Sequence, residues 1–247
     1  MIEVKGVHKS FGALKVLRGV DLQIPKGQIT VILGRSGVGK SVLLKHIIGL
    51  IRPDRGRIWI DKVDITRLGD KDLTEMRKRF GMLFQDAALF DSMNVGANVA
   101  FPLREHTKLN ERDIQRIVAH KLEQVGLPGL EEKLPSELSG GMKRRVGLAR
   151  AIALDPEIVL FDEPTAGLDP PMAESIEHLI IGTQRRLERT FVAITHSIHT
   201  AFHIAHKIAM LHEGRIIEEG SPEAFRGSSN QVVQSFMIRA EHEEEET

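Results

Sequence analysis

Cysteine is absent from this chain of 247 residues. A chain without cysteine has no disulfide framework and no thiolate metal site. The sequence also lacks an excess of either charge, because 34 lysines and arginines balance 34 aspartates and glutamates. A net charge of zero provides no general attraction to nucleic acid or to an anionic membrane surface. We therefore expect no nucleic-acid partner.

Long apolar runs are missing as well. No segment approaches the roughly 18 apolar residues that a membrane-spanning helix needs. The segment Met1–Lys5 lacks the basic region and the following apolar run of a secretory signal. We expect a soluble, cytosolic protein whose role at a membrane would come through a partner. Its length permits one large α/β domain or two small lobes.

Residues 34–41 carry the most specific motif, because they fit the pattern G-x-x-x-x-G-K-[ST] at every fixed position. The loop consists of Gly34, Arg35, Ser36, Gly37, Val38, Gly39, Lys40 and Ser41. Glycines let backbone N–H groups curl around phosphate oxygens, Lys40 carries positive charge toward the β and γ phosphates, and the Ser41 hydroxyl suits Mg²⁺. An apolar strand at 28–33 precedes the loop and a helix at 42–48 follows it, which is the order that a nucleotide site requires.

Polar residues follow three further apolar strands. Gln85 comes after the strand 80–84, Asp162 and Glu163 after the strand 157–161, and His196 after the strand 191–195. In open α/β sheets, ligands bind at the carboxyl ends of the strands. Adjacent carboxylates suit a division of labour in which Asp162 supports Mg²⁺ and Glu163 orients or deprotonates the attacking water. Gln85 is a candidate reporter on the γ-phosphate.

Two other features each allow two interpretations. Ser139, Gly140 and Gly141 precede a helix predicted at 142–154, and they are either an ordinary N-cap or a second anion-binding arrangement. Phe11 is either a core residue or a ring that stacks on adenine. The basic runs 77–79 and 143–145 are most simply solvated faces.

Together with residues 166–169, these motifs resemble an ABC transporter ATPase subunit over nearly the whole chain and in the order of that family. The resemblance implies an α/β fold, a P-loop NTPase with a RecA-like core, an antiparallel β subdomain and an inserted α-helical subdomain. The ABC ATPase domain would cover residues 1–240, with the helical subdomain at about 86–155. Residues 241–247 carry like charges, so we expect an acidic, disordered tail there.

The same resemblance implies roles for individual residues. Phe11 would stack on the adenine of ATP, with Val16 as a further wall of the base pocket. Ser41, Gln85 and Asp162 would hold Mg²⁺. The catalytic residues would be Glu163, His196 as the γ-phosphate switch, and Gln85 as the link between the metal, the attacking water and a transmembrane partner.

In this family, Ser139, Gly140 and Gly141 act on ATP held by a second subunit, and Asp169 lies where two subunits communicate. A homodimer would therefore close head-to-tail around two ATP molecules. The chain departs from the common pattern at Met142, where most members have Gln, and at Val42. Neither departure removes a ligand to phosphate or metal, so we expect hydrolysis to be retained.

A finer resemblance lies in residues 93–106 and 135–142, which are similar to the ATPase of Mla/Mce-type phospholipid transport systems of Gram-negative bacteria. It implies ATP-driven phospholipid transport between the inner and outer membranes. The partners would be transmembrane permease subunits, a periplasmic Mce-type lipid-binding protein and a small cytosolic accessory protein. The chain would sit at the cytoplasmic face of the inner membrane, and the segment after Gln85 would receive a permease helix on apolar residues such as Phe84, Leu89, Phe90 and Met93.

Other functions remain open at this stage. The chain could serve an ABC importer for another substrate, such as amino acids or organic solvents including toluene. It could also be a soluble ABC ATPase outside transport, although such members carry coiled coils, tandem ATPase halves or zinc inserts. A subunit that only clamps ATP is disfavoured because Glu163 and His196 are both present.

Overall fold

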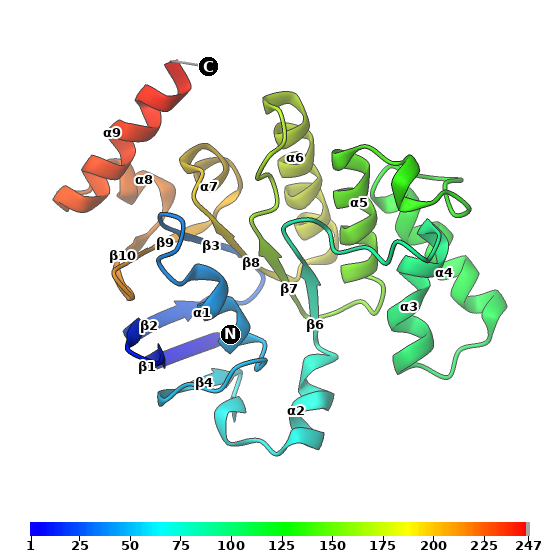
Figure 1. The fold of residues 1–247 in the computed structure, drawn as a ribbon, viewed down its shortest axis with the longest axis horizontal. Coiled ribbons are helices and arrows are strands. Elements are labelled where there is room, and N and C mark those ends of the chain that lie inside the picture. Colours follow the sequence, from blue (N-terminus) through cyan, green and yellow to red (C-terminus); the bar gives the residue numbers. More distant parts are fainter. Residues whose placement is uncertain (246–247) are drawn as a thin grey trace. The chain divides into compact units, whose positions relative to one another are not determined.

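The protein is described by a computed structural model that covers residues 1–245. The chain forms two compact units, which are considered separately below. The first contains residues 1–73 and the chain from Val192 onward, and the second contains Thr74–Phe191. The second unit is larger than the helical subdomain expected at about 86–155, because it includes two strands and a long helix besides. Figure 1 labels most elements of both units.

An antiparallel sheet of four strands begins the first unit. Its strands, in spatial order, are β2 (Leu14–Ile24), β1 (Ile2–Phe11), β4 (Arg55–Ile60) and β5 (Val63–Asp64). Buried and exposed residues alternate along much of β1 and β2, so that one face of the sheet contributes to the core. Register shifts interrupt the pairing of β1 with both neighbours near its middle.

The phosphate-loop motif follows a strand of a second sheet in the same unit. In spatial order, these strands are β10 (Arg215–Gly220), β9 (Lys207–His212), β3 (Ile29–Leu33) and β8 (Thr190–Thr195). All residues of β3 are buried, as a parallel strand covered on both faces requires. Strand β9 runs parallel to β3 and antiparallel to β10. The predicted turn at Glu213-Gly214 is confirmed, since both residues have positive φ between β9 and β10.

The helices of the first unit connect these strands or follow them. They are α1 (Lys40–Ile47), η1 (Ile65–Arg67), α7 (Ile198–Ile204), α8 (Pro222–Arg226) and α9 (Gln231–Glu245), while α2 (Asp70–Arg77) crosses the boundary between the units. The course of α9 differs from our expectation of a disordered tail at 241–247, because the helix continues to Glu245. Glutamate is a good helix former, which fits this result. The last two residues of the predicted tail lie outside the described residues.

The second unit combines two parallel strands with helices. Its elements are β6 (Phe80–Leu83), α3 (Val95–His106), α4 (Glu111–Gln124), η2 (Pro135–Glu137), α5 (Gly140–Ala151), β7 (Ile158–Asp162) and α6 (Pro170–Leu187). Helices α3, α4 and α5 pack against one another (Figure 1). The predicted helices at 111–125 and 142–154 are confirmed, although α5 begins earlier, at Gly140. Strands β6 and β7 pair in register, with Leu83 opposite Phe161.

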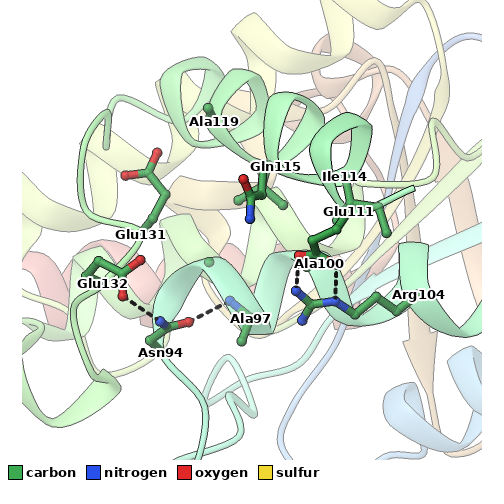
Figure 2. Close-up of a pocket in the computed structure, with 12 residues that line it drawn as sticks. Asn94, Ala97, Ala100, Arg104, Glu111, Ile114, Gln115, Ala119, Glu131 and Glu132 are labelled. Atoms are coloured by element: carbon green, nitrogen blue, oxygen red, sulfur yellow. Dashed lines mark hydrogen bonds and ion pairs between the residues drawn. The ribbon is translucent and has the colours of Figure 1, made fainter. Parts of the chain in front are cut away.

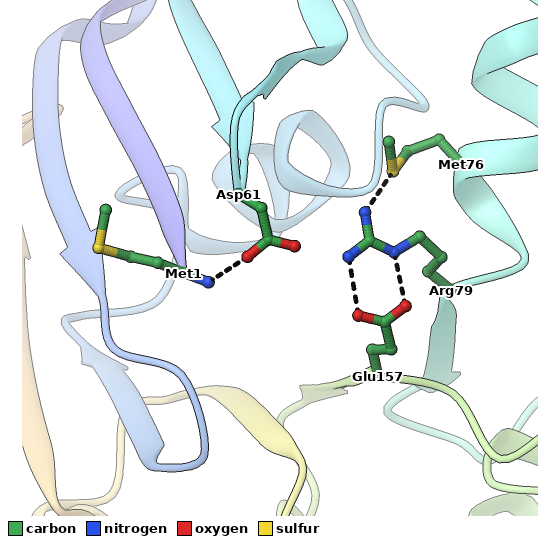
Figure 3. A network of polar contacts seen from close by, with 5 residues as sticks. All are labelled: Met1, Asp61, Met76, Arg79 and Glu157. Atoms are coloured by element: carbon green, nitrogen blue, oxygen red, sulfur yellow. Dashed lines mark hydrogen bonds and ion pairs between the residues drawn. The ribbon is translucent and has the colours of Figure 1, made fainter.

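One basic run is less exposed than we predicted. Arg79, at the end of the run 77–79, uses Nε and Nη2 to bond both carboxylate oxygens of Glu157, at 2.9 and 2.7 Å (Figure 3). The Arg79 carbonyl also accepts the backbone N–H of Glu157. A planar guanidinium matches a carboxylate in this two-bonded geometry. The prediction of a solvated face is therefore wrong for Arg79, which fixes the start of β6 beside the start of β7.

Within residues 1–245, no helix is both long enough and apolar enough to cross a membrane.

Candidate functional site

The loop between β3 and α1 has the backbone shape that its glycines predict. Gly37 and Gly39 have φ of 80° and 105°, a region that side chains with a Cβ rarely adopt. A Cβ on Gly34 would lie 2.4 Å from the Leu211 carbonyl oxygen, so that only glycine fits there. Helix α1 begins after Gly39 without a side-chain cap or an acidic residue in its first turn. An uncapped helix N-terminus after such a loop favours phosphate.

Lys40 lies within this loop. Its side chain is buried, and Nζ donates to the carbonyl oxygens of Gly34 and Arg35, at 2.7 and 3.1 Å. Lys40 is the first residue of α1, and these two hydrogen bonds fold its side chain back onto the start of the loop. A buried positive charge in this place suits a strongly anionic ligand.

The predicted base pocket lies on the first sheet of the same unit. Phe11 is the last residue of β1, and 48% of its surface is exposed. The ammonium of Lys9 lies 5.6 Å from the centre of the Phe11 ring. Val16 packs on the phosphate loop, because its Cγ1 would lie 2.9 Å from a Cβ on Gly39. The structure thus joins Val16 to the loop and leaves the Phe11 ring accessible for stacking.

His196 lies beside the start of the phosphate loop. The backbone N–H of Gly34 donates to the carbonyl of Thr195, the last residue of β8, at 3.3 Å. His196 follows directly and is exposed. Ser197 caps α7 by accepting the N–H of Thr200, which fixes the turn that carries the histidine. The first unit therefore brings the loop and His196 to the same edge of its sheet.

The second unit brings together the other polar strand ends. Because Leu83 pairs with Phe161 in parallel register, Gln85 and the pair Asp162 and Glu163 leave neighbouring strands at the same edge. Gln85 is exposed, Asp162 is half-buried, and only 8% of the Glu163 surface is exposed. A buried carboxylate next to a more accessible one supports the divided roles that the sequence predicts.

Glu163 has an unusual backbone conformation. Its φ is 49°, in the left-handed region, where residues other than glycine are uncommon. Such a conformation costs on the order of 1–3 kcal/mol, and residues that retain it cluster at functional sites. The sequence gives no sign of this feature, because Glu is not a residue that favours positive φ.

Ser139 and Asp169 cap two helices of the second unit. Ser139 Oγ accepts the N–H of Met142 at the start of α5, and Asp169 Oδ1 accepts the N–H of Met172 at the start of α6. A Cβ on Gly141 would approach the Met172 sulfur at 3.2 Å, so the two helix starts lie close together. Ser139 is thus an N-cap in the single chain, as one of the two interpretations predicts. This role does not conflict with the other interpretation, in which residues 139–141 bind an anion.

The second basic run, 143–145, is also less exposed than predicted. Arg144 is buried and donates to the Ala166 carbonyl, and this burial lowers the pKa of its guanidinium. Arg145 donates to the Val125 carbonyl and to Ser175 Oγ, each at 2.7 Å. The prediction of a solvated surface is wrong for these two arginines, which tie α5 to the segment between β7 and α6 and to neighbouring helices.

Two residues that the sequence analysis missed hold the segment after Gln85. Arg150 donates to the carbonyl oxygens of Ala87 and Ala88, at 2.6 and 2.8 Å, and both alanines have positive φ. Asn98 is fully buried, accepts the N–H of Phe90, and donates to the carbonyls of Phe90, Met93 and Asn94. No sequence signal marks either residue, because Arg150 bonds carbonyls that are 62 and 63 residues away and Asn98 bonds backbone groups of the irregular segment just before α3.

We expect Asn98→Ala to lower the free energy of unfolding by about 1–3 kcal/mol, because the Phe90 N–H loses its buried acceptor. Urea denaturation of the purified chain measures this change. Gln115→Ala, on an exposed position of α4, serves as the control and is expected to stay within about 0.5 kcal/mol of the parent. An equally small effect of Asn98→Ala would contradict its role as an anchor.

A hollow of about 460 Å³ lies between α3 and α4 in the second unit (Figure 2). An ion pair between Arg104 and Glu111 borders it, and this pairing lowers the pKa of the Glu111 carboxyl. Asn94, Glu131 and Glu132 also line it. None of the residues predicted to bind nucleotide or metal contributes to this hollow.

Comparisons with known proteins agree with the geometry. Residues 17–166 match the family model described as ABC transporter. The chain is 48% identical over 236 residues to a probable ribonucleotide transport ATP-binding protein, mkl, of Mycobacterium leprae, covering 96% of this chain and 68% of that protein. It is 44% identical over 237 residues to the intermembrane phospholipid transport system ATP-binding protein MlaF of Haemophilus influenzae, covering 96% and 90%.

A solved structure extends the likeness to the fold. The dimeric post-hydrolysis state of the ATP-binding cassette MJ0796, bound to ADP and Pi, superposes with a TM-score of 0.82 at 31% identity, over 90% of this chain and 99% of that one. The predicted P-loop NTPase fold is thereby confirmed. The chain belongs to the ABC transporter family and is one of its ATPase subunits.

Proposed function

We propose that this ATPase powers phospholipid transport between the inner and outer membranes. The observation that carries the proposal is the similarity to MlaF, which extends over nine-tenths of both proteins. Met142, unusual for ABC ATPases in general, fits the same interpretation because the Mla/Mce-type resemblance includes it. The chain would work at the cytoplasmic face of the inner membrane and reach the membrane through permease subunits.

The phosphate loop supplies the ATP site in this proposal. Gly37 and Gly39 give the loop its positive-φ backbone, and the buried Lys40 ammonium lies over the loop. These features fit a triphosphate. Lys40 would neutralise the β and γ phosphates, with Phe11 and Val16 against the adenine. Backbone N–H groups of the loop would donate to phosphate oxygens, apart from that of Gly34, which donates to the Thr195 carbonyl. His196 would contact the γ-phosphate.

Ser41, Gln85 and Asp162 would hold Mg²⁺, since hydroxyl, amide and carboxylate oxygens are the ligands that this ion prefers. When bound, the ion neutralises charge on the phosphates. Glu163 would accept a proton from the attacking water, and its burial beside Asp162 suits a base rather than a metal ligand. Gln85 would report the presence of the γ-phosphate to the permease.

We further propose that two copies of the chain enclose two ATP molecules. The structure of MJ0796 with ADP and Pi is a dimer, which supports this arrangement. Ser139, Gly140 and Gly141 would bind the ATP of the opposite copy, because the start of α5 offers backbone N–H groups beyond the one that Ser139 caps. Asp169, at the start of α6, would lie where the copies communicate.

An apolar groove of the second unit is the proposed docking site for a permease helix. It has a volume of about 420 Å³, and its lining includes Phe84, Phe90, Phe101 and Leu154. Phe84 and Phe90 are 39% and 41% exposed and line the same groove, and contiguous exposed apolar residues mark interaction sites. Arg150 and Asn98 fix this segment, so that a partner would meet a preformed surface.

Purification of the chain with its native membrane partners tests the cargo. We expect permease subunits, an Mce-type lipid-binding protein and a small cytosolic accessory protein, together with bound phospholipid, by mass spectrometry of proteins and lipids. A bait with Phe84→Ser and Phe90→Ser serves as the control and should lose the permease. Recovery of an amino-acid or metal-ion permease without a lipid-binding protein would contradict the proposal.

Similarity to mkl supports a second candidate, because that relative is described as a ribonucleotide transport protein. The same purification separates the two functions. Ribonucleotide transport would be favoured if the recovered complex took up labelled ribonucleotides into vesicles and contained no bound phospholipid.

A further inference from the structure

The first unit contains a cavity with a strongly basic lining. Its volume is about 470 Å³. The charged and polar side chains that decide its character are His8, Lys15, Arg18, Asp54, Arg55 and Arg215. Four of these carry a positive charge and one a negative charge, in a chain whose total charge is zero. The lining is therefore far more basic than the protein as a whole.

Strand pairing brings these residues to one place. His8 on β1 lies opposite Arg18 on β2 and opposite Arg55 on β4, so that the three form a row across the sheet. Lys15 pairs with Ser10, two residues further along β1. Residues directly opposite each other in an antiparallel sheet project from the same face. Three basic residues of the cavity thus come from one sheet whose strands lie side by side (Figure 1).

The fourth basic residue comes from β10, in the other sheet of this unit. The Arg18 backbone N–H donates to the Gly214 carbonyl at 2.8 Å, which joins β2 to the turn before β10. Arg215 is the first residue after that turn. A Cβ on Gly214 would lie 2.5 Å from the Val16 carbonyl oxygen, so the close approach of the two sheets requires glycine there. The position of Arg215 at the cavity is therefore fixed by the backbone.

The positive charges of the cavity are not neutralised by the protein. Lys15, Arg18, Arg55 and Arg215 form no ion pair with any carboxylate among residues 1–238, whose side chains the structure describes. Asp54 is already engaged, because it accepts from Lys9 Nζ and from the Ser10 N–H, at 2.8 and 2.7 Å. The Lys9 bond lowers the pKa of the Asp54 carboxyl. Arg18 and Arg55 lie on the strands either side of His8, so an external anion between them would offset the repulsion of two like charges.

We infer that this cavity binds an anion that bears phosphate, such as a pyrophosphate or a phosphomonoester. Guanidinium groups match phosphate oxygens with two parallel hydrogen bonds, and three arginines surround the cavity. Its volume is within the range of sites for small ligands. The anion could be soluble or could be the headgroup of an anionic lipid, since both present the same chemistry.

The cavity is separate from the nucleotide site. Its lining contains no residue of the loop 34–41, neither Phe11 nor Val16, and not His196. Leu17 lines the cavity and packs near Gly39 of the phosphate loop. An anion in this cavity would therefore bind outside the phosphate loop, with Leu17 between the cavity and Gly39 of that loop.

Titration calorimetry of the full-length chain tests the inference, with pyrophosphate as the probe and the ATP site filled by a non-hydrolysable ATP analogue and Mg²⁺. We expect pyrophosphate to bind at about 0.15 M salt, and Arg55→Gln with Arg215→Gln to weaken that binding at least about tenfold. The matched control combines Lys26→Gln with Lys62→Gln, two exposed positions of the same unit, which removes the same charge. We expect the control to change affinity less than about twofold, because exposed charges are screened beyond about 8 Å.

A vesicle arm of the experiment identifies the source of the anion. Phosphatidylglycerol vesicles that retain the parent chain, release it on addition of pyrophosphate and fail to retain the arginine variant assign the site to a lipid headgroup. Binding of pyrophosphate without vesicle binding assigns it to a soluble anion. Absence of pyrophosphate binding to the parent chain, or an equal loss in the arginine variant and the lysine control, would overturn the inference. Thermal unfolding of each variant confirms that it is folded.

Discussion

Glu163→Gln is expected to lower the rate of ATP hydrolysis by about 10²–10⁴-fold, the typical contribution of a general base. The amide keeps the size of the side chain and its left-handed backbone but cannot accept the proton of water. ATP should therefore bind and remain intact. Dimers that assemble around ATP should persist, and size-exclusion chromatography with Mg²⁺ and ATP should show them as a stable larger species.

The measurement is steady-state phosphate release by the parent and the variant at saturating ATP. Glu174→Gln, on an exposed position of α6 in the same unit, removes an equal charge away from the strand ends and should hydrolyse ATP at the parental rate. Unchanged hydrolysis in Glu163→Gln would assign the base to another residue. Loss of ATP binding in that variant would show that its effect is structural rather than chemical.

Lys40→Ala is expected to reduce affinity for ATP by roughly 10²–10⁴-fold. The ammonium would donate to oxygens of two phosphates, and each hydrogen bond to a charged group contributes about 1.5–3 kcal/mol. The substitution also leaves the carbonyls of Gly34 and Arg35 without their buried donor. Fluorescence titration with a labelled ATP analogue measures the change.

Lys45→Ala is the matched control, because Lys45 is an exposed lysine of the same helix. Its affinity for ATP should remain within about twofold of the parent. Circular dichroism of Lys40→Ala separates loss of binding from loss of fold. Parental affinity in a folded Lys40→Ala chain would refute the assignment of residues 34–41 to the triphosphate.

The parts of the site that the sequence predicts are those whose chemistry is local. Gly37 and Gly39 predict positive φ, because other residues avoid that conformation. The apolar strand that ends before Asp162 and Glu163 predicts that both carboxylates lie at the carboxyl edge of the sheet. Periodicity places α4 and α5 within a few residues of their observed bounds. In each case the pattern that predicts a loop, strand or helix lies within the residues of that same element.

The parts that the sequence does not predict depend on contacts between distant segments. Arg144 and Arg79 belong to basic runs that are usually solvated, yet one is buried against the Ala166 carbonyl and the other is paired with Glu157. Arg150 bonds carbonyls 62 and 63 residues away, so that no spacing reveals it. Asn98 bonds the nearby segment before α3, but that segment is irregular and has no periodic pattern. Charge and polarity in a sequence do not tell whether a partner is water or a remote peptide group.

The left-handed backbone at Glu163 has an evolutionary consequence. In a descendant released from the need to turn over ATP, asparagine or glycine at this position would relieve the local strain and raise thermal stability. Selection for stability would then favour the replacements that remove the carboxylate. A homologue with either residue after its aspartate would therefore mark a lineage in which selection for hydrolysis has ended while the fold persists.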